Sequence, residues 1–316
     1  MNSPPEAPWA CRRDTKPVRL PQVIGHRGYK AAFPENTMSA FRGAVDVGAH
    51  AIEADLHLSK DGVVVLSHDA TLKRCFGRPL KIADCDWNYL STLRTLREPR
   101  QPMPRLVDLL EYLAQPEQAH VWLLLDIKTD DDSTQLLTRL AATIASVPTS
   151  RPWNQRLILG PWDAHWMAAC LRFLPGFSLA LIAYSPEYAT ALLPVHNLNF
   201  NVFNYSFATP SGSRFFRQVK KRGRLTFSWS DNQVEWMARS LRNEVDAVIT
   251  DDPKLFLELC NKWHLDETQK RALKPTMKQT ALWVLINFMV LVTEIIFRLL
   301  KGSPSSRVKK VLGTLT

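Results

Sequence analysis

The sequence predicts a TIM barrel, an α/β fold of the (β/α)8 type, followed by a hydrophobic membrane-anchoring helix. Eight short apolar runs alternate with amphipathic segments of helical length, ionisable residues gather where these runs end, and a long apolar stretch comes after the last of them. Near-continuous apolar strands that alternate with helices are typical of a parallel sheet, and a count of eight favours a closed barrel. A doubly wound open sheet is the alternative, although no G-x-G-x-x-G follows any run.

Composition divides the 316 residues into three segments. Residues 1–20 are rich in proline and lack the apolar core of a secretory signal, so we expect a flexible lead-in. Residues 21–265 carry the eight runs and predict the barrel. Residues 266–316 predict a basic linker, an anchor at 281–300 and a basic tail. This last segment holds nine basic and three acidic residues, which accounts for +6 of the net charge of +10.

The composition also limits the expected partners and compartment. The barrel region has no cluster of basic residues interleaved with aromatic ones, so we do not expect nucleic acid as a partner. The five cysteines are scattered, without a C-x-x-C pair, which indicates reduced thiols rather than a disulfide framework or structural zinc. The oligomeric state is left open.

The apolar runs predict the strands in order along the chain. They cover residues 22–27, 51–58, 121–128, 156–162, 177–184, 198–205, 224–229 and 245–250. The second run is followed by Lys-Asp-Gly at 60–62, a tight-turn signal, and then by a further apolar run. Antiparallel pairing across this turn would set Val64 opposite Leu58 and return His68 toward Glu53.

Reactive side chains of such barrels collect where the strands end. The polar residues at the predicted strand ends are His26 and Arg27, Glu53 and Asp55, the returning His68, Asp126 and Lys128, Trp229, and Asp251 or Asp252. Residues two apart share a face of a strand, so Glu53 and Asp55 would lie together. With Asp126 they form an all-oxygen set suited to a hard divalent cation, Mg²⁺ or Ca²⁺, rather than zinc.

These residue types fit phosphodiester cleavage better than acyl or hydride transfer. His26 and His68 can serve as base and acid near neutral pH. A cation and Arg27 can offset the charge that develops on phosphoryl oxygens. Each of these residues, taken singly, has an ordinary structural explanation. Their order at successive strand ends favours a catalytic site.

The motifs resemble those of a known family. The stretch "GHRG...PENT...AF...A...GA..IEADLHLSKDGVVVLSHDATL" is similar to the opening of glycerophosphodiester phosphodiesterases, and "LLLDIK", "FSWSDN" and "VDAVITDDP" look like variants of later family motifs. The resemblance covers residues 22–260, and within the family the chain looks most like the fungal phosphatidylglycerol phospholipase C branch. Sphingomyelinase D-type enzymes, which generally lack the opening "HRG", are a weaker match.

The resemblance implies roles for individual residues. His26 and His68 match the acid/base pair. Arg27 matches the phosphate-contacting arginine, while Lys128 and Trp229 match further substrate-binding positions. Glu53, Asp55 and Asp126 match the metal ligands, with an aspartate in "D-I-K" where the family usually has glutamate. The "W-S-D-N" sequence departs from the family's "W-T-x-N", which leaves the details of the pocket wall open.

The apolar stretch 281–300 indicates the class of substrate. As a helix its 20 residues span about 30 Å, the thickness of the hydrocarbon layer. Asn287, Glu294, Arg298 and Lys301 form a narrow polar stripe on it, so a spanning anchor, an interfacial helix and a helix packed on the barrel are all considered.

We expect a membrane-associated enzyme that hydrolyses phosphatidylglycerol to diacylglycerol and glycerol 3-phosphate. The alternatives are a phosphodiesterase acting on deacylated phospholipids and a catalytically silent barrel that binds lipid headgroups. The expected location is an intracellular membrane (mitochondrial, endoplasmic reticulum or lipid droplet surface) with the barrel facing the cytosol.

Overall fold

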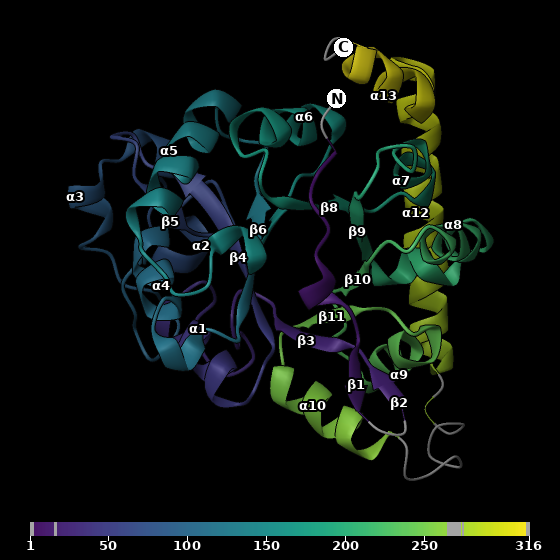
Figure 1. The fold of residues 1–316 in the computed structure, drawn as a ribbon, viewed down its shortest axis with the longest axis horizontal. Coiled ribbons are helices and arrows are strands. Elements are labelled where there is room, and N and C mark those ends of the chain that lie inside the picture. Colours follow the sequence, from purple (N-terminus) through teal and green to yellow (C-terminus); the bar gives the residue numbers. More distant parts are fainter. Residues whose placement is uncertain (1–2, 16–17, 264–272, 274, 314–316) are drawn as a thin grey trace.

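The computed structural model describes residues 3–15, 18–263, 273 and 275–313. Eight parallel strands close into a barrel in the order β3-β11-β10-β9-β8-β7-β6-β4, and pairing of β3 with β4 completes the ring (Figure 1). The strands are β3 (Gln22–Gly25), β4 (Ala51–Leu58), β6 (Trp122–Ile127), β7 (Leu157–Gly160), β8 (Ser178–Ala183), β9 (Asn199–Phe203), β10 (Thr226–Trp229) and β11 (Ala247–Thr250). All eight fall within the predicted runs, so the closed barrel is confirmed.

Helices follow the barrel strands and cover the outside of the barrel. They are α1 (Met38–Asp46), α4 (Leu106–Leu113), α5 (Ser133–Ser146), α6 (Ala164–Phe173), α7 (Pro186–Ala191), α8 (Pro210–Lys221), α9 (Val234–Asn243) and α10 (Pro253–Lys262). Short 3-10 helices lie at η3 (Pro116–Gln118), η4 (Trp153–Gln155) and η5 (Asn204–Ala208). Several helices begin where a side-chain oxygen at the N-cap accepts an early backbone N–H, as Thr37 does for α1 and Asp252 for α10.

The predicted hairpin after β4 is present. Strand β5 (Val64–Leu66) pairs antiparallel with β4, and Val64 lies opposite Leu58 as expected. The chain then forms α2 (Lys73–Phe76), η2 (Ile82–Asp84) and α3 (Trp87–Leu90), which pack around a small apolar cluster of their own. This insertion returns His68 to the end of the barrel where β4 ends.

The N-terminal segment differs from the flexible lead-in that its composition suggests. It contains η1 (Pro8–Ala10), β1 (Arg13–Thr15) and β2 (Val18–Leu20). Ala7 and Ala10 are buried, and the ring of Trp9 lies 5.5 Å from that of Trp122 at the start of β6. Gln22 donates a hydrogen bond to the carbonyl of Trp9. The segment therefore closes the end of the barrel at which the strands begin, because tertiary packing outweighs local composition.

Two helices follow the barrel, α12 (Met277–Lys301) and α13 (Pro304–Gly313), and appear in yellow along one side of Figure 1. Most of the predicted linker lies outside the described residues. Helix α12 is long and apolar enough to cross a membrane, and none of its most apolar window is buried. It contacts η5, while α13 packs on α6 and α7.

Candidate active site

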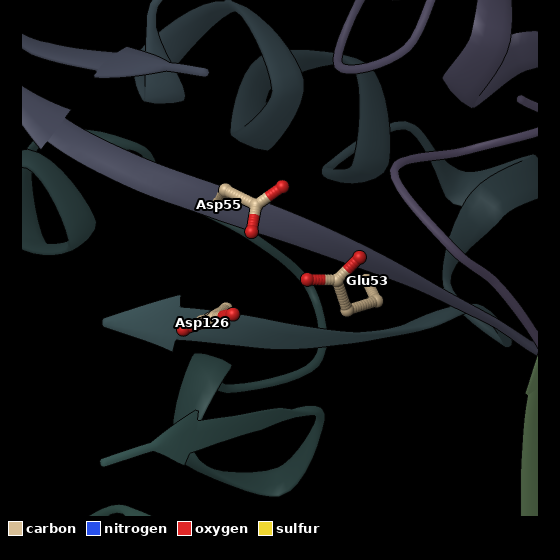
Figure 2. A group of neighbouring side chains, drawn as sticks. All are labelled: Glu53, Asp55 and Asp126. Carbon is tan, nitrogen blue, oxygen red and sulfur yellow. The ribbon is translucent and has the colours of Figure 1, made fainter. Parts of the chain in front are cut away.

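Three carboxylates meet inside the barrel near the ends of two adjacent strands. Glu53 and Asp55 project from β4 and Asp126 from β6, and their side chains point toward one another (Figure 2). Asp55 and Asp126 are direct partners in the register of the two strands. One oxygen of each residue lies within 4.8 Å of the others, and all three residues are buried. The structure therefore brings together the residues predicted to bind a metal.

Two cations partly compensate these three negative groups. The Lys128 ammonium lies 2.6 Å from Asp55 Oδ1 and 2.6 Å from Asp126 Oδ2, and Arg27 Nε lies 3.3 Å from Asp55 Oδ2. Burial alone would raise the pKa of Asp55, but Lys128 and Arg27 hold it well below its usual range. Glu53 lacks comparable ion pairs, so burial and then the charge of Asp55 raise its pKa well above the usual value. Burial likewise raises the pKa of Asp126 to about 6.

A hard divalent cation fits this cluster. Among the described residues, two cationic side chains, Lys128 and Arg27, pair with these three buried carboxylates. Burial, and after it the charge of Asp55, raises the pKa of Glu53 and of Asp126, and a bound cation would offset both effects. Oxygen ligands at this spacing suit Mg²⁺ or Ca²⁺. Glu53, Asp55 and Asp126 are the residues that would hold the ion.

The loop after β3 positions Arg27 over the carboxylates. Arg27 and Gly28 both have positive φ, at 55° and 81°, and a Cβ at Gly28 would lie 2.5 Å from the Ala40 carbonyl carbon. Only glycine is therefore compatible with that position. The left-handed turn lets the Arg27 N–H donate to Glu53 Oε2 at 2.8 Å while its guanidinium pairs with Glu35 at 2.7 Å.

Each predicted catalytic histidine is oriented by a carboxylate at Nδ1. His26 Nδ1 lies 2.5 Å from Asp251 Oδ1, and His68 Nδ1 lies 2.8 Å from Asp69 Oδ1. Asp251 also pairs with Lys30, at 3.2 Å. A carboxylate at Nδ1 fixes the Nδ1–H tautomer, so Nε2 is the nitrogen available for proton transfer.

Both histidines have a pKa below the ordinary value, and both interact with the charge of Asp55. Burial lowers the pKa of His26 most, against the raising effect of Asp251. Burial also lowers the pKa of His68, against the raising effects of Asp55 and Asp69. His68 is the more exposed, with 36% of its side chain accessible against 14% for His26. A lowered pKa favours the neutral imidazole near pH 7, which is the form in which the histidine that acts as base accepts its proton.

An aromatic wall stands beside the carboxylates. Trp229, predicted as a substrate-binding residue, lies at the end of β10 with its ring 5.7 Å from Trp162 and 5.0 Å from Tyr184. Trp162 follows β7, and its indole N–H donates to Asp126 Oδ1 at 2.7 Å. Lys128 Nζ lies 5.8 Å from the Trp162 ring centroid. The wall thus joins the carboxylate cluster to the neighbouring strands.

The structure adds residues that the sequence argument did not assign. Glu35 pairs with both Arg27 and Arg74, and these bonds hold its pKa at about 2 despite burial. Asn36, with φ of 53°, donates to Asp55 Oδ2 at 2.7 Å. Trp162 is the last residue of the predicted strand run 156–162. Its place at the end of a run was the available signal, as it is for Trp229 at the end of 224–229.

The chain is similar in sequence to known proteins. The sequence profile described as the glycerophosphoryl diester phosphodiesterase family matches residues 26–255. The chain is 24% identical over 249 residues to a glycerophosphodiester phosphodiesterase of Caldanaerobacter subterraneus, covering 76% of this chain and 98% of that protein.

Two solved structures share the fold. The crystal structure of a putative glycerophosphoryl diester phosphodiesterase from Silicibacter pomeroyi superposes with a TM-score of 0.70 at 20% identity, covering 81% of this chain and 97% of the other. A phosphodiesterase from Oleispira antarctica, solved in complex with the product sn-glycerol-3-phosphate, superposes with a TM-score of 0.66 at 20% identity, covering 77% and 97%.

Proposed function

Because the chain belongs to the glycerophosphoryl diester phosphodiesterase family, it is a phosphodiesterase, and we propose that its substrate is membrane phosphatidylglycerol, which it cleaves to diacylglycerol and glycerol 3-phosphate. The observation that carries the reaction type is the buried cluster of Glu53, Asp55 and Asp126 next to two histidines that are each oriented by a carboxylate. The resemblance to the fungal phosphatidylglycerol phospholipase C branch supports the choice of lipid.

The histidines supply the proton transfers of a two-stage reaction. One imidazole takes the proton of the headgroup hydroxyl next to the esterified carbon, and that oxygen bonds to phosphorus. The other imidazole protonates the diacylglycerol oxygen as its bond to phosphorus breaks, which leaves a cyclic glycerol phosphate. Water then opens the ring, and the histidines exchange roles.

The remaining groups bind and orient the phosphate. Arg27 and Lys128 lie beside the carboxylates, where their charge offsets that of the phosphoryl oxygens. A divalent cation in the carboxylate cluster, when bound, draws electron density from the same oxygens. The internal hydroxyl supplies a nucleophile that is already in place, which lowers the entropy cost of the first stage.

Helix α12 supports action at a membrane, because its polar side chains contact the barrel while most of its large apolar ones are exposed. Trp283 Nε1 and Asn287 Nδ2 donate to the Tyr205 carbonyl, at 3.0 and 3.4 Å. Glu294 accepts from Ser185, and Arg298 pairs with Glu187. The large apolar side chains that are exposed on this helix include Leu282, Val284, Leu285, Phe288, Leu291, Val292, Ile295, Ile296, Leu299 and Leu300.

A helix with this polarity is suited to lipid rather than water, since a soluble helix buries its apolar face. Its polar contacts with the barrel run from Gln279, which donates to Gln233, to Arg298, about 28 Å at 1.5 Å per residue. A helix held alongside the barrel over that length favours an orientation in the plane of the membrane surface. We place the enzyme on an intracellular membrane with its barrel in the cytosol; the five free cysteines support a reducing compartment.

A lipid panel tests the proposed reaction. Full-length protein in mixed detergent micelles is given phosphatidylglycerol, phosphatidylcholine or deacylated glycerophosphoglycerol, with and without EDTA, and diacylglycerol and glycerol 3-phosphate are measured. We expect cleavage of phosphatidylglycerol, loss of it with EDTA, and recovery with Mg²⁺ or Ca²⁺. Intact phosphatidylcholine should resist because its headgroup has no hydroxyl next to the esterified carbon.

His68→Ala is the matched variant for this panel, and it should lose nearly all turnover with an unchanged circular dichroism spectrum. Cleavage of glycerophosphoglycerol alone would instead assign the enzyme to deacylated phospholipids. Headgroup binding without turnover of any substrate would indicate a silent barrel.

A further inference from the structure

A large cavity lies between the barrel and the two C-terminal helices. Its volume is about 750 Å³, within the range of about 300–1,000 Å³ typical of small-molecule sites. The barrel contributes Trp162, Tyr184 and Phe203 to its lining, and α12 contributes Ile286, Val290 and Phe297. The lining is thus mainly aromatic and aliphatic, and the proposed proton transfers use none of these six residues.

The two acidic groups at this cavity already have partners. Glu294 accepts from the Ser185 hydroxyl, and Asp163 accepts from the N–H of Trp166 at the start of α6. The Arg307 guanidinium on α13 lies over the ring of Tyr188, 5.5 Å from its centroid, and its buried Nε has no hydrogen-bond partner among the described residues. Because both carboxylates are engaged in the protein's own contacts and the rest of the lining is mainly apolar, the cavity suits an apolar chain.

Two side chains border both the cavity and the active site. The Trp162 ring lines the cavity, while its indole N–H bonds to Asp126 of the carboxylate cluster. Tyr184 lines the cavity as well, and its ring lies 5.0 Å from Trp229 in the wall of the site. Although it belongs to this aromatic cluster, Tyr184 is 49% exposed. A ligand whose phosphate lies at the carboxylates can therefore extend an attached chain over these rings into the cavity.

We propose that this cavity binds an acyl chain of the diacylglycerol leaving group during phosphodiester cleavage. The inference rests on the proposed function, since it assigns the cavity to the lipid part of that substrate. Met289 and Phe297 of α12 line the cavity and are also 60% and 42% exposed, so a chain drawn from the lipid layer has a short apolar route inward. Burial of the chain favours substrates with longer chains, at about 0.8 kcal/mol or roughly fourfold per buried methylene.

Two valines on α12 provide a matched pair for the test. Val290 lines the cavity and Val284 is 53% exposed on the outer face. Val290→Trp should fill the cavity, whereas Val284→Trp adds the same side chain outside it. For each protein, kcat/KM is measured in detergent on dihexanoyl-, dioctanoyl- and didecanoyl-phosphatidylglycerol, and on glycerophosphoglycerol. Binding of cis-parinaric acid is followed by fluorescence as a readout that requires no turnover.

We expect kcat/KM of the wild type and of Val284→Trp to rise steeply with chain length. In Val290→Trp, the ratio of kcat/KM on didecanoyl- to kcat/KM on dihexanoyl-phosphatidylglycerol should be at least tenfold smaller than in the wild type. This variant should keep wild-type turnover of glycerophosphoglycerol and lose cis-parinaric acid binding. Equal chain-length dependence and equal probe binding in the two variants would overturn the cavity assignment while leaving the reaction intact. If the wild type cleaves no phosphatidylglycerol, the proposed function fails. Selective loss of the probe in Val290→Trp would then show an acyl site that serves another lipid.

Discussion

At the scale of single residues, the two His–Asp pairs allow the acid/base roles to be separated. The Asp251 carboxylate stabilises the protonated form of His26, so its removal in Asp251→Asn should lower the already depressed pKa of His26 further. The limb of the pH profile of kcat/KM that reports His26 should therefore move to lower pH, by about one unit. The limb moves to lower pH whether His26 acts first as base or as acid.

Asp69→Asn is the matched comparison for that experiment, because Asp69 raises the pKa of His68. It should move the opposite limb of the profile and leave the His26 limb in place. If neither variant moves a limb, the observed pH dependence belongs to other groups and the His–Asp pairs only position the rings.

The carboxylate cluster gives a prediction about stability as well as turnover. Without a cation, Glu53, Asp55 and Asp126 repel one another inside the barrel. Added Mg²⁺ or Ca²⁺ should raise the free energy of unfolding by about 2.7 kcal/mol at a hundred times its Kd. Thermal unfolding of EDTA-treated protein, titrated with each ion, measures this.

The same titration of Asp126→Asn should show a much smaller gain, while Asp130→Asn, at an exposed position three residues past β6, should respond like the wild type. An identical gain in all three proteins would place the cation elsewhere.

The sequence alone predicted the cluster of three carboxylates, but it did not predict the hydrogen-bond partners around that cluster. The convergence of Glu53, Asp55 and Asp126 follows from strand spacing and from the shared end of a parallel barrel. The pairing of His26 with Asp251 depends on how two loops far apart in the chain come together. The bond from Trp162 to Asp126 likewise depends on the conformation of the chain after β7, which local sequence does not encode.

At the scale of elements, the strands and the β4–β5 hairpin were predictable because each has a local signal of its own. An apolar run marks a strand, and Lys60–Gly62 marks the turn that fixes the register of Val64 against Leu58. The orientation of α12 was not predictable, because a polar stripe on an apolar helix can face a barrel, water or another helix. The structure places Asn287 and Glu294 against the barrel.

Removal of α12 and α13 tests whether this element is separable. A chain lacking residues 277–316 should fold, because the barrel ends with α10. It should be less stable by about 1.5–3 kcal/mol, since Val308 of α13 is 2% exposed and packs on the barrel core. It should leave the membrane fraction and retain turnover of glycerophosphoglycerol, with the full-length protein as control. Continued sedimentation with vesicles would assign membrane affinity to the barrel.

At the scale of the whole molecule, the two ends of the barrel have different structures. The N-terminal segment closes one end, where Trp9 packs against Trp122. The carboxylates, the histidines and α12 all lie toward the other end, where the strands finish. Composition alone did not predict this division, because a proline-rich segment carries no local sign that a barrel will bury it.

The outward apolar face of α12 has a kinetic consequence. An enzyme held at a lipid surface searches for its substrate in two dimensions, so its rate follows the mole fraction of that substrate in the surface, which is phosphatidylglycerol in the proposed reaction. Mixing phosphatidylcholine into the vesicles at constant total phosphatidylglycerol should slow the reaction by surface dilution. Adding more vesicles of unchanged composition, once all the enzyme is bound, should leave the rate constant.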